Sequence, residues 1–343
     1  MFASRHLSER ILPLLSIQSR LRLNLEFGQR VNIDYSVLGE VCKQIAGMEK
    51  PEPFDWRDSA HFPDDNEGLT KVSQYFAVGN AINFRYWSLD AGKWQYCHGK
   101  KGGTDERGAY FMWRSLRLCD EKGSFPILDA SKLAQITSSQ IKRIFMDDDG
   151  SITMPDLQER IKNWRDLGNK LYEYWSGEFY NLLKQTKGSL FRFIQYSRQF
   201  RAFDDPLCKM TMVNAIMHQG RGLVEFDEPL LPAMDYELLK QQMRMGILVL
   251  TENLKKKIVD KQILQSDEAR ELRNAGLRAF ITMIKKTGIG GHLIDNIWWF
   301  NRVACRTDNP VCQIKGEEHK CKFLNVCHKR IEYKIPLEVT RYY

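Results

Sequence analysis

Residues 266–286 read SDEARELRNAGLRAFITMIKK, and this stretch indicates the fold class of the chain. Its apolar residues recur at three- and four-residue spacing, which places them on one face of an α-helix. Ser266 is a good N-cap residue and two acids follow it, so we expect the helix to begin there. Residues 156–186 and 234–262 show the same periodicity. The sequence therefore predicts a mainly α-helical protein.

The expected β-structure is small and lies near residues 80–100. Strand-forming residues occupy 83–89 and 93–97, on either side of the sequence Asp90-Ala91-Gly92. Two short strands around such a turn are typical of a β-hairpin. We therefore expect one small β-hairpin element beside the helices.

Length and composition describe an ordinary globular chain. With 343 residues, 43% of them hydrophobic, it can bury a sizeable core. No long polar linker divides it, so we predict a single domain over residues 1–343 with a soft internal boundary near 145–155. Apolar runs all fall short of the roughly eighteen residues of a membrane span, and no membrane partner is expected. Residues 1–30 favour an amphipathic helix, with a transit peptide as the alternative, and the free thiols favour a reducing, cytoplasmic location.

The charge balance suits an anionic ligand. Fifty-one Lys and Arg residues against 43 Asp and Glu give a net charge of +8. Nucleotide phosphate and nucleic acid are both compatible partners for such a chain. Charge alone does not separate an enzyme acting on nucleotides from a protein that binds DNA.

Four cysteines lie within residues 305–327, spaced C-x6-C-x8-C-x5-C. Zinc sites usually take cysteines in pairs two to four residues apart, and this segment has no such pair. Spacings of five to eight fit a loop around a larger object such as a [4Fe–4S] cluster. We therefore expect a cluster here, with zinc as the alternative and unligated or disulfide-bonded thiols also open. The expected ligands are Cys305, Cys312, Cys321 and Cys327.

Four short stretches, taken in order along the chain, resemble one known family. They are residues 31–34 (VNID), 80–87 (NAINFRYW), 234–236 (MDY) and 293–296 (LIDN), the last followed by Trp298 and Trp299. In this order and at these separations they resemble the queuosine salvage protein family. The cysteine segment adds a second likeness, because its runs NPVC and CKFLNVC are similar to the cluster loop of endonuclease III-like DNA glycosylases.

The resemblance implies a fold, an activity and a substrate. The fold would be helical and related to the helix-hairpin-helix DNA glycosylases. The activity would be hydrolysis of an N-glycosidic bond, which releases the 7-deazaguanine base queuine from queuosine or its 5′-phosphate. The partner would be a small nucleoside or nucleotide.

Asp235 is the candidate catalytic residue. Cleavage of an N-glycosidic bond builds positive charge on the sugar, and a fixed carboxylate stabilises that charge or attacks it. The alternative is that Asp235 only complements the dipole of the helix that it precedes.

The other candidates would bind the substrate. Asp295 and Asn83 could read the edge of the base, and Asp295 could instead pair with the cationic arm of queuine. A planar base also needs aromatic walls, although aromatic residues at such spacing are more often core. Lys209 could meet a phosphate, and His61 resembles a family position near the base. The complete set of expected binding residues is His61, Asn83, Phe84, Trp87, Lys209, Tyr236, Asp295 and Trp299.

The chain departs from the family pattern at three places. Asn80 stands where the family has Asp, Met234 where it has an aromatic residue, and Asn301 follows Trp299 closely where the family tends to place Asp. The base or its attachment could therefore differ from queuine. A DNA-binding base-excision glycosylase with a structural cluster is the alternative function, and an inactive helical scaffold is the third interpretation.

Overall fold

The computed structural model describes residues 25–49, 52–90 and 93–343, which divide into two compact units. Unit 1 contains the described residues of Met1–Pro53 together with Glu228–Val339. Unit 2 contains Phe54–Asp227 and the C-terminal residues Thr340–Tyr343. The expected soft boundary near 145–155 falls inside unit 2.

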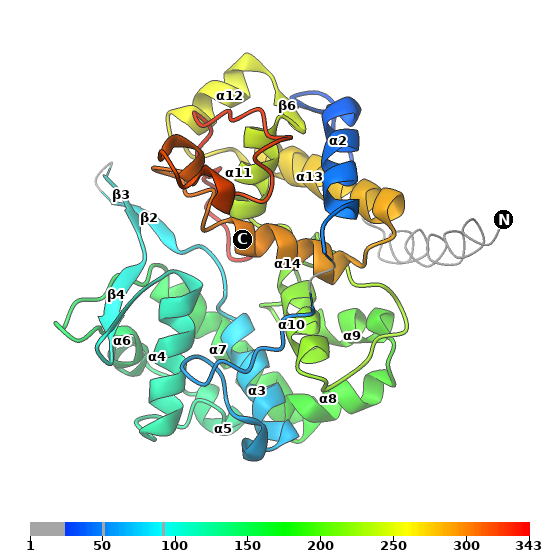
Figure 1. The fold of residues 1–343 in the computed structure, drawn as a ribbon. Helices are drawn as coiled ribbons and strands as arrows, with labels where there is room; N and C mark the ends of the chain where they lie inside the picture. Colours follow the sequence, from blue (N-terminus) through cyan, green and yellow to red (C-terminus); the bar gives the residue numbers. More distant parts are fainter. Residues whose placement is uncertain (1–24, 50–51, 91–92) are drawn as a thin grey trace. The chain divides into compact units, whose positions relative to one another are not determined.

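Unit 1 is a group of helices with one small sheet (Figure 1). Strands β1 and β6 pair antiparallel, with Asn32 opposite Val249. Helix α13 packs against α2, β1 and α14, and α11 packs against both α13 and α14. The elements are β1 (Val31–Ile33), α2 (Tyr35–Ala46), α11 (Tyr236–Met245), β6 (Leu248–Leu250), α12 (Glu252–Val259), α13 (Ser266–Thr287), α14 (Gly291–Asn301) and the 3₁₀ turns η2 (Val311–Gln313) and η3 (Glu318–Lys320).

Glu271 ties the start of β1 to α13 within unit 1. One of its carboxylate oxygens accepts hydrogen bonds from the backbone N–H groups of four successive residues, 28–31, at 2.7–3.2 Å. The other oxygen pairs with the guanidinium of Arg30 at 3.1 Å. A single buried carboxylate thus satisfies a whole turn of backbone donors.

Unit 2 is helical as well, with two small hairpins at one side (Figure 1). Its elements are η1 (Asp65–Glu67), α3 (Leu69–Asn80), β2 (Trp87–Asp90), β3 (Lys93–Tyr96), β4 (His98–Lys101), β5 (Thr104–Arg107), α4 (Ala109–Glu121), α5 (Ala130–Leu133), α6 (Ser138–Phe145), α7 (Leu157–Trp175), α8 (Phe179–Thr186), α9 (Leu190–Ser197) and α10 (Lys209–Gly220).

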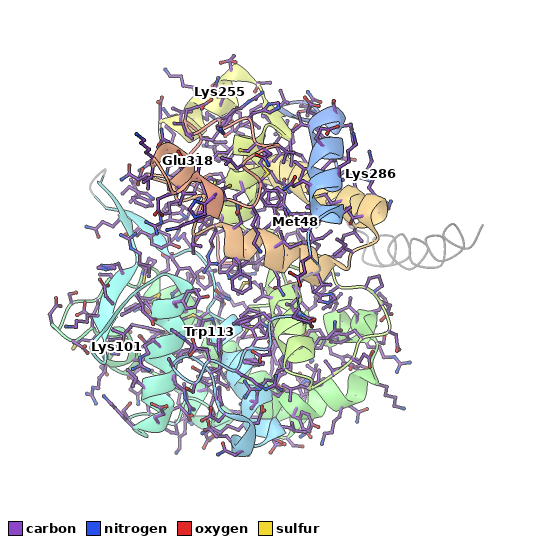
Figure 2. All side chains as sticks on the ribbon, viewed as in Figure 1. Met48, Lys101, Trp113, Lys255, Lys286 and Glu318 are labelled. Carbon is purple, nitrogen blue, oxygen red and sulfur yellow. The ribbon has the colours of Figure 1, made fainter. Side chains whose placement is uncertain are left out.

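The core of unit 2 depends on a close approach of α3 to α4. Trp113 of α4, labelled in Figure 2, is buried. The centroid of its ring lies 5.3 Å from that of Phe62 and 5.6 Å from that of Tyr75. A β-carbon on Gly79 of α3 would overlap this indole ring. Glycine at position 79 therefore provides the space that the tryptophan fills.

The predicted mainly α fold is confirmed, and most expected elements are present. Residues 266–286 form α13, although Gln265 and not Ser266 caps it, through a capping box with Glu268. The hairpin is present as β2 and β3, and a second hairpin, β4–β5, was not expected.

Two of the periodic stretches are interrupted in the structure. Residues 156–186 form two helices, α7 and α8, and Ser176 and Gly177 between them both have a positive φ. Residues 234–262 do not form one helix, because Gly246 ends α11 with a φ of +88° and β6 follows it. A left-handed glycine is a usual helix terminator, and periodicity alone does not reveal it.

Among the described residues, none of the helices combines the length and the apolar character that crossing a bilayer requires. Most of the segment 1–30, for which an amphipathic helix or a transit peptide was expected, lies outside the described residues.

Candidate active site

Asp235 is the N-cap residue of α11 and follows the proline-containing run 228–232. Its backbone is extended, and its Oδ1 accepts the backbone N–H of Leu238 at 2.9 Å. The side chain is nearly buried, with 9% exposure. The capping bond fixes the carboxylate, and the positive end of the helix favours its negative charge.

Asp295 holds the backbone just before Asp235. It lies in α14, and its Oδ1 accepts the backbone N–H of Ala233 at 2.8 Å. Gly291 brings the same helix close, because a β-carbon there would overlap the carbonyl oxygen of Leu230. Helix α14 thus fixes the segment 230–233 in unit 1, and with it the position of the catalytic candidate.

Two aromatic residues lie close to these carboxylates in sequence: Tyr236 directly follows Asp235, and Trp299 follows Asp295 in α14. Tyr236 is the first residue of α11 and is 6% exposed. The ring of Trp299 is partly exposed, and the guanidinium of Arg302 lies 3.7 Å from the ring centroid. This cation–π contact covers one side of the indole and orients it.

Asn83 belongs to a chain of amides in unit 2, in the loop of residues 81–86 between α3 and β2. Its Nδ2 donates to Asn80 Oδ1 at 3.1 Å, and its Oδ1 accepts the hydroxyl of Tyr86 at 2.8 Å. Asn80 is fully buried and donates in turn to Asn214 Oδ1 at 3.1 Å. Asn80 thus works as a relay that is both donor and acceptor.

Arg160 of α7 fixes the 81–86 loop. Its buried guanidinium donates to the carbonyl oxygens of Phe84 at 2.7 Å and Arg85 at 2.9 Å, and also to that of Ile82. It lies 4.3 Å from the centroid of the Phe84 ring. Phe84 and Trp87 are only 1% and 2% exposed, as expected of core residues.

Lys209 is a further buried anchor of the loop. Its Nζ donates to the carbonyl oxygen of Asn83 at 2.9 Å. Asp205 accepts three backbone N–H groups in the turn that starts α10 and the hydroxyl of Tyr343 at 3.2 Å. Burial raises the pKa of Asp205. The carbonyl oxygen of Tyr343 in turn accepts the N–H of Arg85 at 3.0 Å, which links the C-terminal residue to the loop.

His61 is held between two carboxylates. Its Nδ1 lies 2.7 Å from Asp58 Oδ2, and its Nε2 lies 2.8 Å from Glu106 Oε1. Partial burial would raise the pKa of Asp58, but the hydrogen bonds from His61 and the backbone of Ala60, together with nearby positive charge, outweigh burial and lower the pKa. Both ring nitrogens of His61 therefore have partners within the protein.

The candidate residues are thus divided between the two units. Asp235, Tyr236, Asp295 and Trp299 belong to unit 1, and His61, Asn83, Phe84, Trp87 and Lys209 belong to unit 2. A family profile described as "Queuosine salvage protein" matches residues 61–287, which is more than half of the chain. The chain belongs to the queuosine salvage protein family.

Three curated relatives agree with this assignment, and each is named queuosine 5′-phosphate N-glycosylase/hydrolase. The protein from Sphaerobacter thermophilus is 29% identical over 165 residues, which are 48% of this chain and 47% of the relative. The mouse protein is 22% identical over 77% of this chain and 82% of its own length. The Nematostella vectensis protein is 25% identical over 64% of this chain and 67% of its own length. The similarity therefore spans about half of the bacterial relative.

The match to the queuosine salvage protein family covers most of the candidate residues. His61, the 81–86 loop, Lys209, Asp235 and Tyr236 lie within it, whereas Asp295 and Trp299 lie beyond its end. Arg160, Asn214 and Asp205 also lie within it, and the sequence interpretation missed all three. A basic residue in a charged helix such as α7 is predicted to lie on the surface. Only the structure reveals the buried contacts of Arg160.

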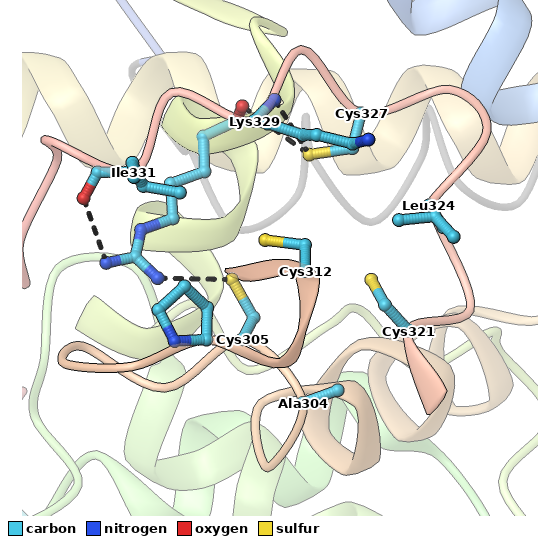
Figure 3. A pocket seen from close by; sticks show the side chains of 10 residues that line it. Ala304, Cys305, Cys312, Cys321, Leu324, Cys327, Lys329 and Ile331 are labelled. Carbon is cyan, nitrogen blue, oxygen red and sulfur yellow. Dashed lines mark hydrogen bonds between the residues drawn. The ribbon is translucent and has the colours of Figure 1, made fainter. Parts of the chain in front are cut away.

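The four cysteines expected to hold a metal also lie outside the queuosine salvage match. They line one cavity together with Arg244, Pro310 and Lys329 (Figure 3). Within the part of the chain that the structure describes, no group of three or more His, Cys, Asp or Glu side chains has the geometry of a single-ion site. All eight cysteines are free thiols.

Proposed function

We propose that this member of the queuosine salvage family hydrolyses the N-glycosidic bond of a 7-deazaguanine nucleotide, with queuosine 5′-phosphate as its substrate. The observation that carries the proposal is the family match over residues 61–287, which includes the capped and nearly buried Asp235. The printed names of three relatives support the same reaction.

In the proposed reaction the bond between the base nitrogen and the sugar carbon breaks, and a bond from water oxygen to that carbon forms. The base leaves with the electron pair and takes a proton. Asp235 stabilises the positive charge that builds on the sugar, from a position fixed by its capping bond to Leu238. A carboxylate held in place before the reaction needs little reorganisation in the transition state.

We propose substrate contacts for each unit separately. Asp295 accepts hydrogen bonds from the guanine-like edge of the base, or forms an ion pair with the cationic arm of the base. Asn83 forms hydrogen bonds with another edge of the base. Tyr236 and Trp299 supply aromatic surface. Lys209 meets the 5′-phosphate as a point charge, while its contact with Asn83 keeps the loop in place. We place the protein in a reducing compartment such as the cytoplasm, because its cysteines are free thiols.

The experiment is to incubate the full chain with queuosine 5′-phosphate in ¹⁸O-labelled water. Mass spectrometry should show free queuine and ribose 5-phosphate carrying one labelled oxygen, and guanosine 5′-phosphate should stay intact as the control. Failure of a folded preparation to release base would overturn the proposal. Tight duplex binding that weakens steeply with salt would then favour the DNA-glycosylase alternative, because such binding releases counterions from several phosphates.

A further inference from the structure

The cysteine cavity occupies the least regular part of unit 1. Between the end of α14 and the end of the unit, the regular elements are two 3₁₀ turns of three residues each, η2 and η3. Cys312 lies within η2, and Cys321 directly follows η3. The thiols of Cys305, Cys312, Cys321 and Cys327 all face the same cavity, although they come from separate turns of the chain (Figure 3). A segment with so little secondary structure needs another source of order.

A buried cation borders this cavity. Arg244, in the last turn of α11, is 2% exposed. Its guanidinium donates to the carbonyl oxygens of Tyr333 at 2.9 Å, Arg306 at 2.6 Å and Thr307 at 2.8 Å. A further N–H group of this guanidinium lies 3.6 Å from the sulfur of Cys305.

Arg244 forms no ion pair with a carboxylate among the described residues. Buried charges in proteins are normally paired, because the loss of hydration costs several kcal/mol. Thiolates around a metal centre carry net negative charge and would balance this guanidinium.

A backbone donor also points at one of the sulfurs. The N–H of Lys329 lies 3.3 Å from the sulfur of Cys327. Hydrogen bonds from N–H groups to cysteine sulfur are a regular feature of iron–sulfur sites, where they tune the cluster. The cavity therefore has four sulfur ligands, a backbone donor and a buried counter-charge.

We propose that Cys305, Cys312, Cys321 and Cys327 bind one [4Fe–4S] cluster. Each thiol gives up its proton and forms one bond to one iron of the cluster. The spacings of five to eight residues and the presence of a cavity between the sulfurs favour a cluster over zinc, whose four sulfurs must converge at about 2.3 Å from a single ion. The inference is independent of the proposed hydrolase activity.

The cluster would pin the C-terminal segment to the end of α11. Arg244 links the cavity to this helix, and Asp235 caps the opposite end. A helix of ten residues spans roughly 15 Å, so the cluster would act as a structural support and would not touch the reacting bond.

The test is the metal and sulfide content of the full chain, purified without oxygen. About four iron and four sulfide per chain, with the visible absorbance of an iron–sulfur cluster, are expected for the wild type. Cys321→Ser and Cys312→Ser should lose most of the iron. Cys42→Ser is the matched control, because Cys42 is a buried thiol of α2 in the same unit and does not line the cavity.

Two results would overturn the proposal. One zinc per chain without iron would show that the centre is not a cluster, and a chain free of both metals would show that the cavity is not a metal site. If the serine variants do not fold, oxidative bleaching of the wild-type cluster provides the test. Bleaching should lower the unfolding temperature of unit 1, and an unchanged temperature would contradict a structural cluster.

Discussion

Lys209 shows how one side chain can serve both a loop and a ligand. It is 6% exposed, and its Nζ already donates to the carbonyl oxygen of Asn83. An ammonium group can donate to several acceptors, and we propose that a substrate phosphate is one acceptor of Lys209.

Substitution of Lys209 separates its contact with the loop from its proposed contact with the phosphate. Lys209→Met should lower kcat/KM for queuosine 5′-phosphate at least tenfold more than kcat/KM for unphosphorylated queuosine, because a hydrogen bond between charged groups contributes about 1.5–3 kcal/mol. Lys170→Met is the control, since Lys170 of α7 also donates to a backbone carbonyl, that of Gln199. Equal losses on both substrates would assign Lys209 to the loop alone.

Asp295 allows a similar separation. In Asp295→Asn the side-chain oxygen can still accept the N–H of Ala233, while the negative charge is lost. If Asp295 contacts the base, kcat/KM should fall roughly ten- to a hundredfold with an unchanged unfolding temperature. Kinetic assays and thermal unfolding of the same preparation provide the check. Unchanged kinetics would leave Asp295 with only its backbone contact.

His218 predicts how stability depends on pH. It is buried in α10 between aromatic rings, donates from Nδ1 to the carbonyl of Asn214 at 2.7 Å and accepts from Ser73 at 3.0 Å. Burial lowers the pKa of His218 to about 4. The unfolded chain, with a histidine pKa near 6.5, therefore binds more protons between these values.

The free energy of unfolding should consequently fall as the pH drops from about 6.5 to about 4, by on the order of 3 kcal/mol from this residue. Denaturant titrations across this range, compared with His218→Gln, measure the contribution. A variant with the same pH slope as the wild type would show that His218 does not titrate in this way.

At the scale of elements, the 81–86 loop depends on α7. Arg160 satisfies three carbonyl oxygens of this loop, and lysine has neither the reach nor the fork of donors to replace it. Arg160→Lys should lower the free energy of unfolding by about 2–4 kcal/mol, because buried carbonyls lose their donors. Urea denaturation measures this change.

Arg165→Lys is the matched control for Arg160. Arg165 is on the same helix, is exposed and donates to a single carbonyl, that of Ile136. We expect it to lose less than about 1 kcal/mol. Equal losses in the two variants would contradict the role of Arg160 as the anchor of the loop.

The sequence predicted regular helices better than their interruptions. Helix α13 agrees closely with the stretch 266–286, because its apolar face recurs without a break. The runs 156–186 and 234–262 are interrupted, the first at Ser176 and Gly177 and the second at Gly246, where the backbone takes a left-handed conformation. The sequence pattern did not predict the second hairpin, because its strands, β4 and β5, are short and mostly charged.

The candidate site was harder to predict than the fold. The order of short motifs identified the family and selected Asp235, whose N-cap position is now seen. Arg160 and Asp205 were missed, because their partners are backbone groups and a C-terminal tyrosine far along the chain. Such contacts leave no local pattern in a sequence.

In the whole molecule, the family match extends across residues of two compact units. Each unit contains candidate substrate-binding residues, and the matched residues 61–287 include parts of both units. The C-terminal cysteine segment lies beyond the match. In the proposed reaction, hydrolysis depends on the carboxylate of Asp235.

The most direct test compares Asp235→Asn with Asp34→Asn. Asp34 is the N-cap of α2 in the same unit, where it accepts the N–H groups of Ser36 and Val37 at 3.0 and 3.1 Å. Asparagine caps a helix about as well as aspartate, so both variants should unfold at the wild-type temperature. Loss of the charge alone is then measured as the rate of base release from queuosine 5′-phosphate. The account predicts a loss on the order of a hundredfold or more for Asp235→Asn and a wild-type rate for Asp34→Asn. A wild-type rate from Asp235→Asn would contradict it and would leave Asp235 as a helix cap only.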